Sequence, residues 1–110
     1  ISGRIIYPFL GVNYVLVTKS VQEQKKLAVD YGALILGGDD GRSGVVKDSP
    51  ADKAGLKTGD IILEFGGEKV SQDQSLSSLI EKRKVGESIS LKVLRGATTL
   101  NLQATLEERR

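Results

Sequence analysis

The chain has 110 residues and a net charge of +2, from 16 basic and 14 acidic side chains with both signs interspersed. This length suits one compact domain, and the near-balanced charge gives no reason to expect a nucleic-acid partner. The chain contains no cysteine and no histidine, so no disulfide holds the fold and no Ser-His-Asp or Cys-His mechanism can be built within it.

Two further classes of protein are disfavoured. No apolar run approaches the roughly 18 residues that a membrane-spanning helix needs. The short basic clusters Lys25-Lys26, 82–84 and Arg109-Arg110 have no aromatic residues interleaved for stacking on bases, so we interpret them as solvated faces. The chain begins at Ile1 with no signal-peptide pattern, and we expect it to be a fragment of a longer protein.

The first stretch of interest is Tyr7–Leu16, which holds a proline, the step Leu10-Gly11-Val12 and then β-prone residues. Pro8 lacks an N–H, so a strand at Ile5-Ile6 cannot simply pair on through it. Gly11 permits a turn that points successive N–H groups into one concavity, a site for an anion such as a peptide's terminal carboxylate. The alternative is an ordinary bend that leads into a core strand.

The next segment predicts a helix, a strand and a loop. Thr18 or Ser20 can cap a helix over 21–30 that covers part of the sheet, and Ala33–Leu36 fits a buried strand. The loop Gly37–Gly44 lacks the ligand alternation of a calcium loop and the Gly-Lys-Ser/Thr of a phosphate loop. Its Asp39-Asp40 pair is not held well enough for catalysis, so we interpret it as a plain exposed loop.

A short helix with complete start and stop signals follows. Ser49 is placed to be the N-cap, Pro50 the first helical residue and Gly55 the left-handed cap. Ile61–Phe65 is then a strand, and Gly66-Gly67 makes a tight hairpin into the next short strand.

The last third predicts a helix and a strand pair. The helix runs over 74–84, with Leu76, Leu79, Ile80 and Arg83 on one face. Two alternating segments at 88–95 and 100–106 predict antiparallel strands, and 107–110 predicts a frayed end. No internal repeat or second domain is evident, so 1–110 is interpreted as one domain with a core of about 5–106.

The segment Ser49–Leu63 resembles the signature of bacterial PDZ domains, and Gly86–Ile89 and Val93–Gly96 fit the same pattern. Tyr7–Val12 resembles the carboxylate-binding loop of the PDZ domains that follow the protease domain in HtrA-type serine proteases. The resemblance implies an α+β, mainly β fold: a small, partly open PDZ-like β-barrel or sandwich of five to six strands with two helices.

The resemblance also implies ligand-binding residues, in a groove between the strand after the loop and the longer helix. The amides that hold the peptide carboxylate are those of Leu10, Gly11 and Val12. The strand that pairs with the peptide backbone continues from Val12 through Asn13, Tyr14 and Val15.

The longer helix supplies the side-chain pocket. The resemblance implies that Leu79 lines this pocket, with Ser75 and Arg83 one turn away on either side. Leu76 and Ile80 are expected to face the core instead.

By resemblance, the chain is a peptide-binding module that recognises apolar C-terminal or extended segments of proteins. It would regulate or feed the serine protease domain of the same chain, in protein quality control in the periplasm or cell envelope. The parent would be a serine endopeptidase, and the resemblance allows it to be homo-oligomeric or membrane-anchored. The fragment itself carries no triad, and no metal or cofactor is expected.

Two alternatives remain open. The first is a structural or oligomerisation PDZ domain with an unused groove. The second is the PDZ domain of a carboxy-terminal processing protease or membrane metalloprotease.

Overall fold

The computed structural model describes residues 8–27, 29–37, 44–46, 48–71 and 73–108. Its main sheet is antiparallel and open, and five of its strands follow the order β2 (Tyr14–Leu16), β3 (Ala33–Ile35), β4 (Ile61–Phe65), β6 (Ser88–Arg95) and β7 (Thr98–Thr105). The sixth strand, β5 (Glu68–Lys69), pairs with β4 through the Gly66-Gly67 hairpin. A separate pair joins β1 (Pro8–Phe9) to β8 (Glu107–Glu108).

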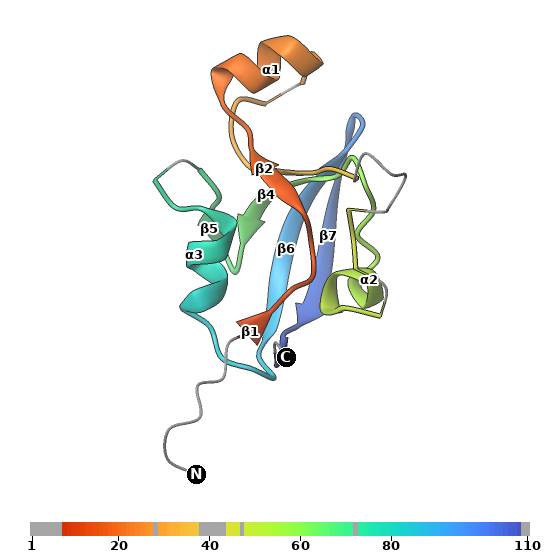
Figure 1. Ribbon diagram of the computed structural model, residues 1–110, viewed down its shortest axis with the longest axis vertical. Helices are drawn as coiled ribbons and strands as arrows, with labels where there is room; N and C mark the ends of the chain where they lie inside the picture. The colour runs from red at the N-terminus through yellow and green to blue at the C-terminus, as the bar shows by residue number, and fades with distance from the viewer. Residues whose placement is uncertain (1–7, 28, 38–43, 47, 72, 109–110) are drawn as a thin grey trace.

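Three helices occur in the described ranges: α1 (Lys19–Lys25), α2 (Pro50–Ala54) and α3 (Leu76–Glu81). Figure 1 shows α3 and α2 on opposite sides of the molecule, with β2 passing between them and α1 standing beyond the end of β2. The expected α+β, mainly β fold is confirmed, with one helix more than the two that the resemblance implies; the sequence patterns had predicted a helix in all three regions. Within the described ranges, every helix falls short of the length and apolar character that a membrane crossing demands.

Helix α2 begins and ends at the predicted residues, because its capping residues are set by the local sequence. The Ser49 hydroxyl accepts a hydrogen bond from the Asp52 N–H at 3.2 Å, Pro50 is the first helical residue, and Gly55 ends the helix with φ of 95°. Each signal satisfies or removes a backbone group that the short helix would otherwise leave unpaired.

The two long strands β6 and β7 pair in the register Leu91↔Leu102, as their alternation predicted. Ile89, Leu91 and Val93 are buried while the residues between them are exposed. Their buried faces join the main core with the inward side chains of β3 and β4. The largest core side chains in the described residues include Phe65, Leu10, Ile35, Ile62, Leu76, Leu79 and Leu106.

The first helix differs from its prediction. It was expected over 21–30 against the sheet, but α1 begins after its N-cap Thr18, ends before Lys26, and buries none of its residues. Lys26 takes a left-handed conformation with φ of 55°, which stops the helix early. The apolar residues that pack come after the helix: Leu27, Val29 and Tyr31 contact a second small cluster around Val17 and Leu34.

Two other boundaries differ from the predictions. The helix expected over 74–84 is shorter, because Ser75 is its N-cap and Lys82 its C-cap. Glu107-Glu108 is not frayed but forms β8, and Pro8 is tolerated in its partner β1 because it begins a short edge strand. Outside the named strands, Val45 forms an isolated bridge with Val12. Ile5-Ile6 and residues 38–43 of the expected loop lie outside the described residues.

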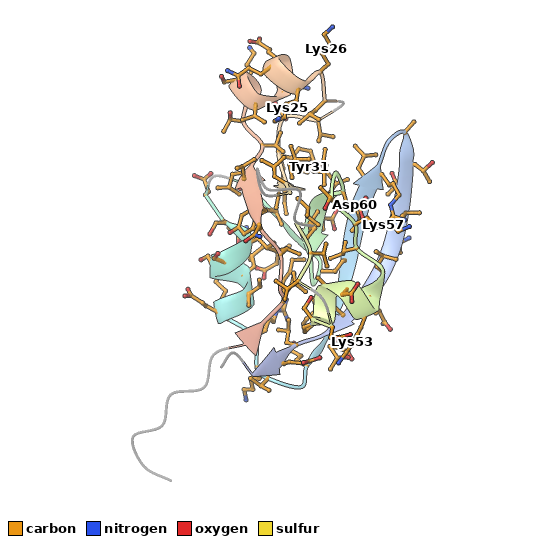
Figure 2. The ribbon with its side chains drawn as sticks, turned by 45° about the vertical axis from the view of Figure 1, so that its right-hand side comes forward. Lys25, Lys26, Tyr31, Lys53, Lys57 and Asp60 are labelled. Atoms are coloured by element: carbon orange, nitrogen blue, oxygen red, sulfur yellow. The ribbon has the colours of Figure 1, made fainter. Side chains whose placement is uncertain are left out.

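A buried ion pair ties the end of β6 to the turn before β4. Asp60 is 1% exposed, and its carboxylate accepts bonds from Arg95 Nε at 2.9 Å, Arg95 Nη2 at 2.7 Å and the Lys57 N–H at 2.9 Å. Arg95 also donates to the Gly55 carbonyl at 2.9 Å, and its bond to Asp60 raises the pKa of Arg95. Figure 2 shows Lys57 and Asp60 side by side.

We predict that Arg95→Met lowers the free energy of unfolding by about 2 kcal/mol. The buried Asp60 carboxylate would lose its charged partner and keep only the hydrogen bond from the Lys57 N–H. We expect a smaller loss than for a fully buried ion pair, because the Arg95 side chain is 38% exposed. Lys92→Met is the matched control, since Lys92 pairs with Glu64 at 3.6 Å and both side chains are exposed to solvent. Urea unfolding measures both, and equal losses would contradict the role given to the Asp60 pair.

Candidate functional site

Strand β2 has one unpaired edge. It is the terminal strand of the main sheet and pairs on one side with β3, in the register Val15↔Leu34. On its other side no strand of the described part of the chain pairs with it, and α3 lies beside it (Figure 1). An unpaired edge is a template for one more strand.

The hydrogen bonds of neighbouring residues show which backbone groups face that edge. The Asn13 N–H donates to the Gly44 carbonyl at 2.7 Å, and the Asn13 carbonyl accepts from the Leu36 N–H at 3.0 Å. The Val17 N–H donates to the Gly32 carbonyl at 2.8 Å. The backbone N–H and carbonyl groups of the odd-numbered residues 13, 15 and 17 therefore point toward the paired side of β2. Because backbone groups alternate along a strand, those of Val12, Tyr14 and Leu16 face outward, and we call them the β2 edge.

The turn that precedes β2 is held by its carbonyl groups. The Leu10 carbonyl accepts from the Ala51 N–H in α2 at 2.9 Å. The Gly11 carbonyl accepts from the Val46 N–H at 2.8 Å and makes a long contact of 3.5 Å with the Ser49 hydroxyl. Gly11 has a φ of 91°, a conformation that a side chain would strain.

These carbonyl bonds set the direction of the amides. No peptide bond in the described residues is cis, so each carbonyl points opposite to the N–H of the next residue. The Gly11 N–H therefore points away from α2, and the Val12 N–H points away from Val46. These two successive N–H groups are thus turned away from α2 and Val46, toward the side where β2 is unpaired.

Glycine is also required where β2 meets the segment 44–46. A Cβ added to Gly44 would lie 2.6 Å from a side-chain carbon of Ile35, closer than real contacts allow. Gly44 accepts from the Asn13 N–H and donates its own N–H to the Thr58 hydroxyl at 2.8 Å. This close approach keeps the start of β2 in place.

Apolar side chains adjoin the β2 edge. Val12, which precedes β2, Tyr14 and Leu16 in β2, and Ile80 in α3 are each partly buried and pack against the main core. Leu10 beneath the turn is 1% exposed and belongs to that core.

A hydrogen-bonded contact joins β2 to the start of α3. The Tyr14 hydroxyl accepts from the Ser77 N–H at 2.9 Å and lies 2.8 Å from the Ser77 hydroxyl. The two residues are 63 positions apart, and no sequence pattern links them.

The predicted residues of α3 are placed differently from expectation. Leu79 has no exposed surface and lies in the core with Leu76, while Ile80 is the partly exposed residue. The Ser75 hydroxyl caps the helix by accepting from the Ser78 N–H at 3.2 Å. The phase of a helix this short is set by its N-cap, and a shift of one residue rotates each side chain by about 100°.

Arg83 is directed to other partners. Its guanidinium donates to the Gly66 carbonyl at 3.3 Å and pairs with Glu87 at 3.2 Å and Glu68 at 3.6 Å. These contacts hold Arg83 on the β4–β5 turn and the loop before β6. They do not place it beside β2.

Asn13 and Val15 follow the same alternation. Asn13 is exposed but directs its backbone toward Gly44 and Leu36, and Val15 pairs with Leu34. Of the four residues predicted to pair with a peptide, Val12 and Tyr14 alone present backbone groups to the free edge.

Sequence reasoning missed three residues that hold the turn at Gly11: Val46, Ser49 and Ala51. Their role depends on contacts between segments that are distant in the sequence.

Metal chemistry has no candidate in this region. Within the part of the chain that the structure describes, no group of three or more acidic side chains is placed to hold an ion. The chain contains neither histidine nor cysteine.

Comparison with known proteins adds independent observations. Residues 8–106 match the family model described as PDZ domain. A protein of Marinomonas sp. (strain MWYL1), named "Probable periplasmic serine endoprotease DegP-like", is 37% identical over 108 residues, which is 98% of this chain and 22% of that protein. A protein of the same name from Chlamydia trachomatis serovar D is 31% identical, over 97% of this chain and 20% of that protein. The chain thus spans about a fifth of these relatives.

Solved structures agree in fold. The HtrA-type protease AlgW with a decapeptide superposes with a TM-score of 0.81 at 28% identity, covering 99% of this chain and 31% of that one. The HtrA3 PDZ domain bound to a phage-derived ligand has a TM-score of 0.76 at 21% identity, covering 96% of this chain and 89% of that one. The second likeness concerns the fold alone.

The expected resemblance to the PDZ domains of HtrA-type serine proteases is therefore confirmed, and this chain belongs to the PDZ domain family.

Proposed function

We propose that the chain is a peptide-binding module that captures the carboxyl terminus of other proteins. The observation that carries this proposal is the turn at Gly11, whose fixed carbonyls direct the N–H groups of Gly11 and Val12 outward. These N–H groups stand at the end of an unpaired strand edge. A terminal carboxylate and the backbone that leads to it fit those two features together.

The binding chemistry divides between the two features. Hydrogen bonds from N–H groups to a carboxylate are charge-assisted and stronger than those between neutral groups. Leu10, named from the resemblance as a third amide donor, stays part of the proposal. The Tyr14 and Leu16 backbone groups add a strand to the sheet, which gives affinity largely independent of the peptide sequence.

Apolar side chains at the same place support a preference for apolar peptide ends. Val12, Tyr14 and Ile80 are partly exposed at the margin of the core, and a hydrophobic terminal residue would cover them. We propose Ile80 as the α3 residue that contacts the peptide, with Leu79 beneath it in the core. Ser75 and Arg83 are engaged elsewhere and supply no peptide contact in this proposal.

The setting of the domain is inferred from its relatives. We propose that its parent is a periplasmic serine endoprotease of the HtrA type, in which residues 1–110 form one domain that regulates or feeds the protease domain of the same chain. Exposed apolar chain ends mark unfolded proteins, so the task is protein quality control. A single short peptide would bind weakly, on the order of micromolar, and gain strength when the parent holds the substrate at a second site.

We predict that the domain binds a hydrophobic peptide with a free carboxyl terminus at least about tenfold more tightly than the same peptide amidated. Amidation removes the charge and one acceptor oxygen, a loss of about 1.4 kcal/mol or more. Fluorescence anisotropy or calorimetry measures both. Equal affinities for the two peptides would show that the turn does not read the carboxylate.

We also predict that Gly11→Ala abolishes detectable binding of the free acid. Gly67→Ala is the matched control, because Gly67 also has a positive φ, of 84°, with nothing within 4 Å of an added Cβ. Both substitutions should cost about 1 kcal/mol of stability through backbone strain. Binding that survives Gly11→Ala unchanged in a folded domain would contradict the assignment of the turn. No binding by the unaltered domain to any of a broad peptide set would favour a structural role.

A further inference from the structure

Strands β2 and β7 lie at the two ends of the main sheet. β7 has eight residues, against three in β2. In the described part of the chain β7 pairs with β6 alone, and Figure 2 shows the β6–β7 hairpin at the right-hand margin of the molecule. The sheet therefore ends in a second free edge, opposite to the β2 edge.

Two hydrogen bonds show which backbone groups of β7 face outward. The Leu106 N–H, directly after β7, donates to the Glu87 carbonyl at 3.0 Å, so Leu106 is turned toward the segment that leads into β6. Ser90 in β6 lies opposite Gln103 and turns its carbonyl the other way, to the Gly66 N–H at 2.8 Å. Because backbone groups alternate along a strand, the outward N–H and carbonyl groups belong to the odd-numbered residues. We call these exposed residues the β7 edge: Thr99, Asn101, Gln103 and Thr105.

The sequence of β7 lacks the features that usually protect a free edge. Edge strands are commonly short, or carry charged residues, prolines or bulges that hinder pairing with another chain. β5 follows this rule with two residues, Glu68 and Lys69, and β2 follows it by its length. β7 reads Thr-Thr-Leu-Asn-Leu-Gln-Ala-Thr, with no charged residue and no proline. Its composition favours strand pairing and does nothing to oppose it.

We propose that the β7 edge is a self-association surface, which pairs antiparallel with the β7 edge of a second copy of this chain. One register uses the whole edge, around a two-fold axis at Leu102. It places Asn101 opposite Gln103 of the partner subunit, and Thr99 opposite Thr105 of the partner subunit. Each opposed pair exchanges two backbone hydrogen bonds, so the two main sheets become one continuous sheet.

A second copy fits this edge because β7 is complementary to itself. In a two-fold pair a strand meets its own sequence, so a charged residue near the axis would face a like charge. The uncharged β7 edge instead brings amide against amide and threonine against threonine, which are favourable cross-strand pairs. On the other face, Leu102 meets its own copy and Leu100 faces Ala104 of the partner subunit. Leu100 and Leu102 are partly exposed in the single chain, and pairing would cover them.

This association goes beyond peptide binding and does not depend on it. Since β2 and β7 are at opposite ends of the sheet, pairing through β7 leaves both β2 edges free. The dimer would then present two peptide sites. One strand edge buries less than the roughly 1,200 Å² of a stable interface, so we expect weak dimerisation, with a Kd on the order of 100 μM.

Sedimentation equilibrium measures the dimer, over concentrations from about tenfold below to tenfold above that Kd. We expect Asn101→Glu combined with Gln103→Glu to weaken dimerisation about tenfold or more, because carboxylates then meet across the axis. Asn101→Glu combined with Gln103→Lys should restore the affinity of the unaltered domain within about threefold, because each glutamate then faces a lysine. The two variants differ only at Gln103.

The matched control is Gln22→Glu combined with Gln24→Glu. It adds the same two negative charges to α1, which buries none of its residues, and should leave dimerisation unchanged. Amide exchange then locates the interface. As the dimer forms, the amides of Asn101 and Gln103 should become slow, while the Leu102 amide, which faces β6, is slow throughout. Thermal unfolding confirms that each variant is folded.

Three results would overturn the proposal. A domain that stays monomeric at the highest concentration does not self-associate at this edge. Dimerisation that the two β7 variants change equally, or that neither changes, runs through another surface or register. An assembly that dissociates when a hydrophobic free-acid peptide is added in excess uses the β2 edge instead. Peptide binding by a domain that stays monomeric would leave the proposed function standing.

Discussion

The candidate site depends on one constraint: a trans peptide bond cannot turn its carbonyl inward without turning the next N–H outward. The Leu10 carbonyl is held by α2, and the Gly11 carbonyl is held by Val46, so the next two amides point away from these partners, toward the unpaired edge of β2. The donor groups of the site therefore need no side chain of their own. The side chains do the positioning instead, since Leu10 anchors the turn in the core and Ser49 fixes the start of α2.

The same arrangement leaves β2 as an exposed strand edge, which in other proteins invites aggregation. Here the edge is short, at three residues, and the chain leaves it directly into α1. The Tyr14–Ser77 contact also ties the middle of the edge to α3. The buried pair of Asp60 and Arg95 ties the start of β4 to the end of β6, in the middle of the same sheet.

Local patterns predicted the elements whose causes are local. Ser49, Pro50 and Gly55 specified α2, and alternation specified β6 and β7. Contacts between distant residues were not predictable in this way: β8 pairs with β1 across the whole chain, and Tyr14 bonds to Ser77. The phase of α3 also escaped the sequence, because its face holds Leu76, Leu79 and Ile80 in close succession and burial depends on the N-cap. The turn at Gly11 was found, but the bonds that orient it were not.

Hydrogen exchange of single amides tests the central claim most directly. In the free domain, the amides of Asn13, Val15 and Val17 should exchange slowly, and those of Tyr14 and Leu16 fast. With a saturating hydrophobic free-acid peptide, Tyr14 and Leu16 should become slow, since they then pair with the added strand. Protection of Tyr14 and Leu16 without peptide, or a bound peptide that leaves them fast, would contradict an open strand edge as the binding site.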